Sequence, residues 1–210
     1  MTRILLADDH AVVRQGLRQI VTESVRGPVF GEASSAEEAL RKAAAEKWDL
    51  VILDISLPGK SGLDVLKELR AAKPGVPVLV LSMHPEEHFA VRALKAGAAG
   101  YVTKRTAARD LAAAVKKVLA GGRYVSASLA ERLASEIRVG PGQVPHERLS
   151  DREYQVFRML ASGKTVKEIG EELSLTPQTV STHRSRILEK MGMEANANLT
   201  QYAIQNRLLE

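Results

Sequence analysis

Four short apolar runs in the first half of the chain are each followed closely by polar or charged residues. Amphipathic segments separate the runs, so the pattern predicts strands that alternate with helices, as in a parallel sheet. Ligands of such sheets bind beyond the carboxyl ends of the strands, so we expect the polar residues to meet at one edge. The runs and the residues after them are Ile4–Ala7 with Asp8 and Asp9, Leu50–Leu53 with Asp54, Val78–Leu81 with Ser82, and Tyr101–Val102 with Lys104.

The expected edge carries an excess of acid, because three aspartates accompany one lysine. Carboxylates that lie close together repel one another unless a cation joins them, and Mg²⁺ prefers oxygen ligands. Asp9, Asp54 and the backbone oxygen of Ser56 would bind the ion directly, with Asp8 acting through a water molecule. The sequence therefore predicts a magnesium site.

Asp54 can attack a phosphoryl group there as an oxygen nucleophile. Lys104 would pair with a phosphate oxygen as a point charge, and Ser82 would donate its hydroxyl to another. Each residue alone is more often a turn former or a solvated side chain, but their joint position at strand ends favours a phosphate site. We expect His84 and His88 on the surface of the next helix, because the carboxylates already suit a hard cation.

Residues 1–122 contain five strand–helix units, which predicts an α/β domain with a doubly wound parallel sheet. Ser34 and Ser35 can cap the second helix, and Gly121 with Gly122 ends the fifth. The strands are expected near residues 3–8, 28–33, 49–53, 77–82 and 100–103, and the helices near 11–25, 36–46, 62–72, 86–96 and 107–120.

Residues 123–147 are expected to link this domain to a second one, since 210 residues suffice for about two domains. Ser126–Arg138 is amphipathic, with Leu129, Leu133 and Ile137 spaced by four residues, and predicts one helix. Gly140–Pro145 breaks regular structure and is the predicted hinge.

Residues 148–210 lack strand patterns and predict an all-α domain of four short helices. Ser150 and Glu153 have the spacing of a capping box, and Pro177 suits the first position of the third helix. Ser174–Leu175 would join the second and third helices, near 166–173 and from 177 to before Gly192, as a helix-turn-helix. The fourth helix is expected near 196–207.

The third of these helices is the candidate DNA-contact element. The domain has a net charge of only +1, but residues 176–190 carry +2. Charge alone leaves open a solvated helix face, so the arrangement of side chains must decide. The expected buried stripe is Val180, Ile187, Leu188 and Met191. Residues largely off that stripe are Ser181, Thr182, Arg184, Ser185 and Lys190, and the N-terminal half of the helix would face base edges. Residues suited to phosphate oxygens are Lys164, Thr179, Arg186 and Lys190.

The segments LLADDH, LDISLPGKSG, LSMH and GYVTK resemble the receiver domain of bacterial two-component response regulators. The resemblance implies a flavodoxin-like fold with strand order 2-1-3-4-5 and phosphorylation of Asp54 from a phosphohistidine of a sensor histidine kinase. It implies Mg²⁺ held by Asp8, Asp9 and the Ser56 carbonyl, phosphate contact by Lys104, and a switch formed by Ser82 and Tyr101. Arg105 stands where many receivers have proline, so no cis peptide is inferred there.

The segment LSDREYQVFRMLASGKTVKEIGEELSLTPQTVSTHRSRILEKMGM resembles the LuxR-type helix-turn-helix, and together with a receiver it defines the NarL/FixJ class. This resemblance implies that Ser181, Thr182 and Ser185 read bases. It also implies a homodimer, formed on phosphorylation, that binds inverted half-sites of double-stranded DNA, often through contacts of the last helix. The expected function is phosphorylation-controlled transcription regulation, with RNA polymerase as a further candidate partner.

The composition of the chain and its lack of long apolar runs exclude several classes of protein and of metal site. The chain has no cysteine, which excludes disulfides and thiolate metal sites, and no apolar run near the ~18 residues of a membrane span. Without an export signal, a cytoplasmic protein is expected.

Two other functions stay open. An aspartyl-phosphate phosphatase would often need a second Asp two residues after Asp54, where Ser56 stands; we therefore expect no enzyme beyond phosphoryl transfer onto Asp54 and slow self-dephosphorylation. A regulator that acts without phosphorylation, or through protein contacts only, is the other.

Overall fold

The structure is a computed structural model that describes residues 1–57, 60–83, 86–131, 144–206 and 208–209, without the side chains of Glu87 and His88. The chain forms two compact units, Met1–Arg138 and Val139–Glu210. Among the described residues, no helix has the length and apolar character needed to cross a bilayer.

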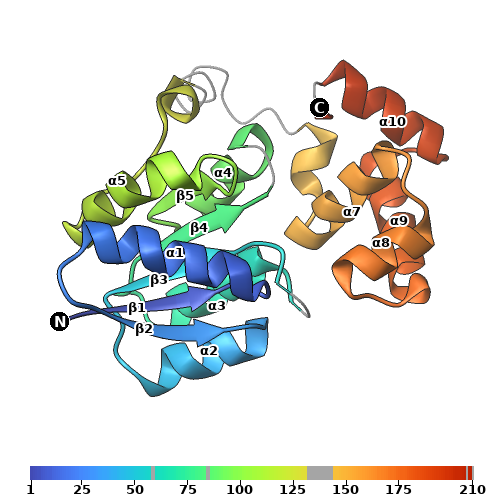
Figure 1. Cartoon of the computed structure of the whole chain (residues 1–210). Helices are drawn as coiled ribbons and strands as arrows, with labels where there is room; N and C mark the ends of the chain where they lie inside the picture. The colour runs from blue at the N-terminus through green and yellow to red at the C-terminus, as the bar shows by residue number, and fades with distance from the viewer. Residues whose placement is uncertain (58–59, 84–85, 132–143, 207, 210) are drawn as a thin grey trace. The chain divides into compact units, whose positions relative to one another are not determined.

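The N-terminal unit has a five-stranded sheet in the order β2-β1-β3-β4-β5, with every neighbouring pair parallel (Figure 1). This order and the alternation of strands with helices confirm the predicted flavodoxin-like fold. The strands are β1 (Thr2–Ala7), β2 (Pro28–Ala33), β3 (Leu50–Asp54), β4 (Val78–Ser82) and β5 (Gly100–Thr103). The helices are α1 (Ala11–Ser24), α2 (Ala36–Ala45), α3 (Gly62–Ala72), α4 (Glu86–Lys95) and α5 (Ala107–Leu119).

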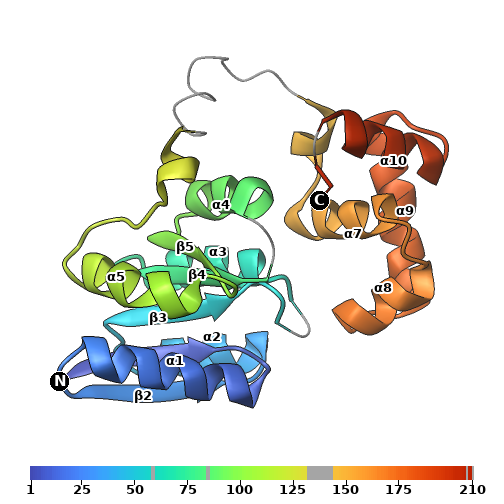
Figure 2. The same cartoon turned by 45° about the horizontal axis from the view of Figure 1, so that its top comes forward.

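Successive side chains of a strand point to opposite faces of the sheet. In this unit, both faces of the sheet are covered. One face packs against α1 and α5, which lie side by side in Figures 1 and 2. Side chains of the central strands that point to the other face, such as Leu5, Val51, Leu53 and Val80, are also buried. The buried parts of these strands are therefore apolar on both faces, as a sheet covered by helices on both sides requires.

Local capping signals act where the sequence placed them. The Ser35 side chain accepts a hydrogen bond from the Glu38 N–H at the start of α2. After α5, Tyr124 returns beside β5, and its N–H donates to the Ala99 carbonyl at 2.8 Å. Residues 127–131 are helical, and the buried Leu129 follows the Ser126 cap. Leu133, Ile137 and most of the predicted hinge lie outside the described residues.

In its described part, the C-terminal unit contains helices joined by short loops and no strand, as predicted. Its elements are a 3-10 helix η1 (Pro145–Arg148), α7 (Asp151–Ala161), α8 (Val166–Leu173), α9 (Pro177–Met191) and α10 (Asn196–Gln205). The capping box of Ser150 and Glu153 is formed with both of its hydrogen bonds, and Thr165 with Glu168 forms a second one. The predicted helix-turn-helix consists of α8, a short turn and α9.

Candidate functional site

Strand register brings the acidic residues together. Ala7 of β1 lies opposite Leu53 of β3, so Asp8 and Asp54 follow on adjacent strands at the same level. Both side chains are buried, and Lys104 joins them: its Nζ lies 2.7 Å from Asp8 Oδ2 and 2.7 Å from Asp54 Oδ2. The Ser56 N–H donates to Asp54 Oδ1 at 3.0 Å. The carboxylates are thus fixed by strands and donors, not by a flexible loop.

Burial and charge act in opposite directions on this group. Burial raises the pKa of Asp54 above its ordinary value, although the Lys104 ammonium and the Ser56 N–H oppose the rise. Burial alone would lower the pKa of Lys104, but Asp54 and Asp8 raise it, so the lysine remains protonated. One ammonium cannot neutralise two ionised carboxylates, so the charges of this group fit a further cation.

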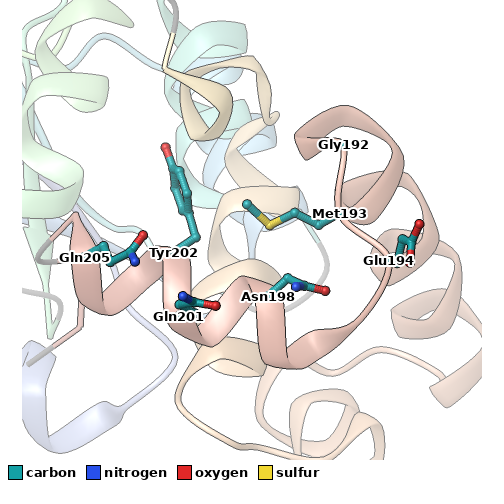
Figure 3. A pocket seen from close by; sticks show the side chains of 7 residues that line it. All are labelled: Gly192, Met193, Glu194, Asn198, Gln201, Tyr202 and Gln205. Atoms are coloured by element: carbon teal, nitrogen blue, oxygen red, sulfur yellow. The ribbon is translucent and has the colours of Figure 1, made fainter.

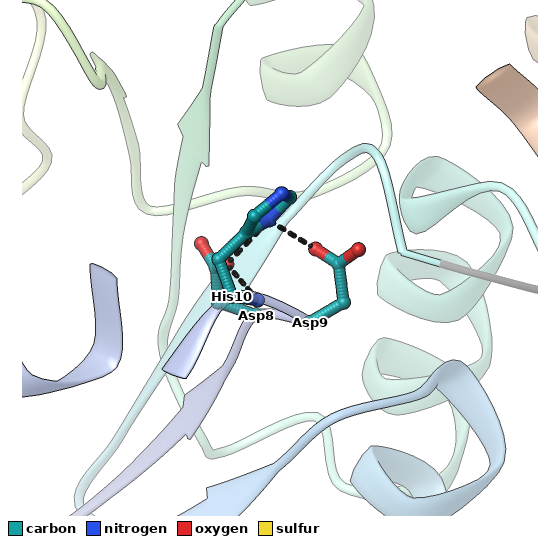
Figure 4. Close-up of side chains that lie close together, drawn as sticks. All are labelled: Asp8, Asp9 and His10. Atoms are coloured by element: carbon teal, nitrogen blue, oxygen red, sulfur yellow. Dashed lines mark hydrogen bonds and ion pairs between the residues drawn. The ribbon is translucent and has the colours of Figure 1, made fainter. Parts of the chain in front are cut away.

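Asp9 extends the acidic group toward solvent, with its side chain 30% exposed. Ligand atoms of Asp8, Asp9 and His10 all lie within 4.8 Å of one another (Figure 4). The carboxylate oxygens of Asp8 and Asp9 are hard donors that suit Mg²⁺ and fit the expected ion, whereas the predicted ligands Asp54 and Ser56 are not members of this group of three. The sequence reasoning missed His10, whose Nδ1 lies 2.7 Å from Asp9 Oδ1; its place directly after the aspartates was the available signal.

The two residues of the expected switch belong to the same end of the sheet. Ser82 ends β4 opposite Thr103, and Tyr101 lies two residues earlier on β5. Both side chains are buried. The Lys104 N–H donates to the Ser82 carbonyl at 2.7 Å, so the backbone links the serine to the lysine. Within the described residues no peptide bond is cis, and Lys104–Arg105 is trans.

The remaining candidates near this edge fall partly outside the description. His84 lies outside the described residues, and so does the side chain of His88. The structure therefore leaves their expected surface positions as predictions.

In the C-terminal unit, α9 presents a mixed polar surface. Val180, Ile187 and Met191 form its buried stripe as predicted, whereas Leu188 is only half-buried. The candidate DNA-contact residues that are exposed are Thr179, Thr182, Ser185, Arg186 and Lys190; those that are half-buried are Lys164, Ser181 and Arg184.

Several of these residues are already engaged within the protein. Lys190 Nζ lies 2.6 Å from Oε2 of Glu153, a buried residue, and Lys164 forms an ion pair with Glu172. Arg184 Nε donates to Asn196 Oδ1 at 2.7 Å, which ties α9 to the first turn of α10. These contacts give the three cations structural partners that sequence spacing did not reveal.

The turn before α9 has a strained backbone at one residue. Ser174 has φ of 53°, and it is the only described non-glycine residue with a positive φ. The Leu175 N–H donates to the Gly170 carbonyl at 2.8 Å, and a Cβ on Gly170 would lie 2.8 Å from the Leu175 oxygen. Glycine at this position therefore permits the close approach that sets α9 against α8.

A shallow hollow of about 430 Å³ lies where α9 ends and α10 begins (Figure 3). Asn198, Gln201 and Gln205 line it from α10, with Met193 and Glu194 on the preceding turn. Among the described residues of the lining, Glu194 is the one charged side chain, and these residues offer no phosphate- or metal-binding set.

Comparisons with known proteins agree with this division. Residues 4–116 match the family "Response regulator receiver domain", and residues 147–203 match "Bacterial regulatory proteins, luxR family". Response regulator UvrY of Escherichia coli strain K12 is 35% identical over 99% of this chain and 96% of its own length. Response regulator GacA of Pseudomonas viridiflava is 35% identical over 100% of this chain and 99% of its own.

The solved structures give the same result. RcsB from Salmonella enterica serovar Typhimurium, "bound to promoter rprA in the presence of phosphomimetic BeF3-", has a TM-score of 0.62 and 26% identity, over 96% of this chain and 98% of that one. The chain has aspartates at the carboxyl edge of a parallel sheet, a helix-turn-helix and these relatives. It therefore belongs to the response regulators and combines a receiver domain with a LuxR-family regulatory domain.

Proposed function

We propose that phosphorylation of Asp54 by a sensor histidine kinase controls the binding of this protein to duplex DNA and so regulates transcription. The observation that carries the proposal is the buried Asp54 carboxylate, bonded to Lys104 and to the Ser56 N–H beside Asp8. An Asp54 oxygen would attack the phosphorus, and the phosphorus–nitrogen bond of the donor would break. The domains proposed for this function are residues 1–122, the linker 123–147 and residues 148–210.

The residues around Asp54 have separate tasks in this proposal. Asp8, Asp9, Asp54 and the Ser56 carbonyl would hold Mg²⁺, which neutralises charge on the transferring phosphoryl group. Lys104 would exchange its bond to the Asp54 carboxylate for one to a phosphate oxygen, because that oxygen carries more charge. Ser82, at the end of β4, and Tyr101, two residues before the end of β5, are both buried; they would then rearrange and shift the population of receiver conformations.

The α9 surface supports the DNA-binding half of the proposal. Thr182 and Ser185 are exposed, and Ser181 lies beside them, half-buried, where they would meet base edges in a major groove. Arg186 and Thr179 would contact phosphates, as would Lys164, Lys190 and Arg184 to the extent that they leave their protein partners. One structural relative is described as "two RcsB dimers bound to two parallel DNAs", which favours a homodimer on duplex DNA here as well. We further propose that this homodimer binds inverted half-sites. Such a regulator would act in the cytoplasm, where it could also meet RNA polymerase.

The test is intact-mass measurement after incubation with acetyl phosphate and Mg²⁺. Wild type should gain one stable phosphoryl group, and Asp54→Asn should gain none. Asp110→Asn, which changes an aspartate near the surface of α5, should label like wild type. Unchanged labelling of Asp54→Asn would refute the assignment, and fast release of phosphate without an adduct would favour the phosphatase.

The DNA half is tested by selecting bound fragments from random duplexes with phosphorylated and unphosphorylated protein. Phosphorylation should sharpen the recovered sequence into two inverted half-sites. Equal recovery by both forms would favour a regulator that works without phosphorylation.

A further inference from the structure

Arg14 connects three elements at the acidic edge. It lies in the first turn of α1, and its side chain is only 14% exposed. Its Nε donates to Glu32 Oε2 at 2.8 Å, near the end of β2, and its Nη1 donates to the Asp8 carbonyl at 2.7 Å, just after β1. The guanidinium is rigid and planar, so two bonds in different directions fix the Asp8 backbone relative to both elements.

Asp8 is consequently held on every side. Its N–H donates to the Ala33 carbonyl at 3.0 Å, and its own carbonyl accepts from Arg14. Its carboxylate accepts from the His10 N–H at 2.9 Å through Oδ1 and meets Lys104 at 2.7 Å through Oδ2. Of these contacts, the one with Arg14 is made by a side chain outside the phosphate and metal set.

The charge of Arg14 is balanced away from the site. The Glu32 carboxylate accepts hydrogen bonds from both Arg14 and Arg18, and the two guanidinium groups hold the pKa of Glu32 below its ordinary value. Arg14 therefore contributes geometry at the acidic edge while its charge is paired with Glu32. Arg18 is a suitable comparison, because its Nη1 donates to the Glu32 carboxylate at the same distance of 2.8 Å. Among the described contacts of Arg18 there is no hydrogen bond to Asp8.

We infer that Arg14 is a positioning residue for divalent-cation binding, because it fixes the Asp8 backbone whose carboxylate helps to hold the ion. The inference rests on the proposed function. Mg²⁺ requires near-ideal octahedral ligands, so a small displacement of one carboxylate weakens it. Loss of groups that orient metal ligands typically costs about 10–100-fold in metal affinity, and we expect about tenfold here.

The sign of the effect separates positioning from charge. Arg14→Met removes a positive charge near a cation site, so electrostatics alone would strengthen binding. Positioning predicts the opposite, weaker binding. Arg18→Met removes an equal charge and an equal bond to Glu32, so it is the matched control and should bind the ion as wild type does or slightly more tightly.

The experiment measures Mn²⁺ binding to the full chain by the loss of the free-ion EPR signal, with Mg²⁺ as competitor. Arg14→Met should raise the dissociation constant about tenfold. With acetyl phosphate, the half-saturating Mg²⁺ concentration should rise equally, while the labelling rate at saturating Mg²⁺ stays near that of wild type. Thermal unfolding without metal checks that each variant is folded.

Arg14→Lys is the second variant, needed if Arg14→Met does not fold. Lysine has one nitrogen in place of the two, Nε and Nη1, that bond Glu32 and the Asp8 carbonyl, and its flexible stem does not fix the directions of its bonds. Binding should therefore still weaken although the charge is kept. Unchanged Mn²⁺ affinity in a folded Arg14 variant would overturn the inference and leave the proposed function intact. If wild type itself bound no Mn²⁺ in competition with Mg²⁺, the proposed metal site would fail, and the inference with it.

Discussion

The two units of this response regulator arrange their candidate functional residues in opposite ways. In the receiver, Asp8 and Asp54 are about 1% exposed, and Lys104 holds both. On α9, the hydroxyl and basic side chains are mostly exposed. The side chain of Lys190, which forms an ion pair with Glu153, is 40% exposed. Burial thus distinguishes the proposed site for a small ion from the proposed surface for a large ligand.

The physical reason is the source of the geometry. A phosphoryl group and a metal ion are small, so the protein must supply every ligand at a fixed distance, and strand ends do this well. A DNA duplex is rigid and brings its own row of phosphates, so exposed side chains can adjust to it. The same type of ion pair should therefore contribute very differently to stability in the two settings.

The largest difference is expected for lysines. Lys104→Met leaves two buried carboxylates without their cation and should destabilise the metal-free receiver by about 3–5 kcal/mol. The control is Lys60→Met, which breaks an exposed pair with Glu68 and should cost less than about 1 kcal/mol. Urea unfolding followed by Trp48, the single tryptophan and buried in this unit, measures both. Similar costs for the two variants would contradict the comparison.

Helical glycines should also differ in sign between the units. A Cβ on Gly170 would press on the Leu175 oxygen, so Gly170→Ala should destabilise the LuxR-family unit by about 1–3 kcal/mol. Gly16 of α1 has no atom within 4 Å of such a Cβ, so Gly16→Ala should stabilise the receiver by up to about 1 kcal/mol. Circular dichroism during urea unfolding tests the first and Trp48 fluorescence the second; a stabilised Gly170→Ala would show that the turn is not tight.

The sequence predicted the strands, the helix starts and the residues at the strand ends better than it predicted the partners of exposed side chains. Apolar runs predicted four of the five strands, and the alternation of strands with helices predicted the fifth. The positions after the runs predicted which side chains meet, because parallel strands with helical connections end at one edge. The receiver could be anticipated closely, since backbone register decides most of its site. Ser150 and Glu153 likewise predicted the start of α7, because a capping box is local.

Contacts between distant side chains could not be predicted in this way. Lys190 lies 37 residues from Glu153, and its spacing on α9 is equally compatible with a free phosphate-binding cation. Arg14 was also missed, although β2 beside β1 places Glu32 within its reach. Long side chains choose among several partners, and only packing decides between them.

Two basic residues of α9 should separate structural from DNA-binding roles. Lys190→Met leaves Glu153, whose side chain is 4% exposed, without its cation and should cost about 1–2 kcal/mol of stability. Arg186→Met should change stability by less than about 0.5 kcal/mol but weaken binding to every duplex and reduce the salt slope by about 1. Urea unfolding and fluorescence anisotropy at several salt concentrations measure the two effects. An unaltered salt slope would remove Arg186 from the phosphate contacts.

The smallest effect on stability is expected when the pH is lowered. It concerns one glutamate in each unit, Glu38 in the first turn of α2 and Glu153 in the first turn of α7. Lys42 and the Ser34 N–H lower the pKa of Glu38 to about 2, and Lys190 and Ser150 lower that of Glu153 although burial opposes them. A carboxyl with a depressed folded pKa stabilises fully above its unfolded value of 4.5, and this contribution is lost as pH falls through the folded value.

Glu38→Gln should therefore lose less receiver stability than wild type between pH 4.5 and about 2. The difference should be under about 1 kcal/mol, because the pair with Lys42 is partly exposed. Urea midpoints from Trp48, whose Nε1 donates to the Lys42 carbonyl at 3.0 Å, report on this helix directly. Glu37→Gln removes an equal charge from the same turn and should keep the acid sensitivity of wild type; an equal flattening by both variants would assign the effect to net charge and not to the Glu38 contacts.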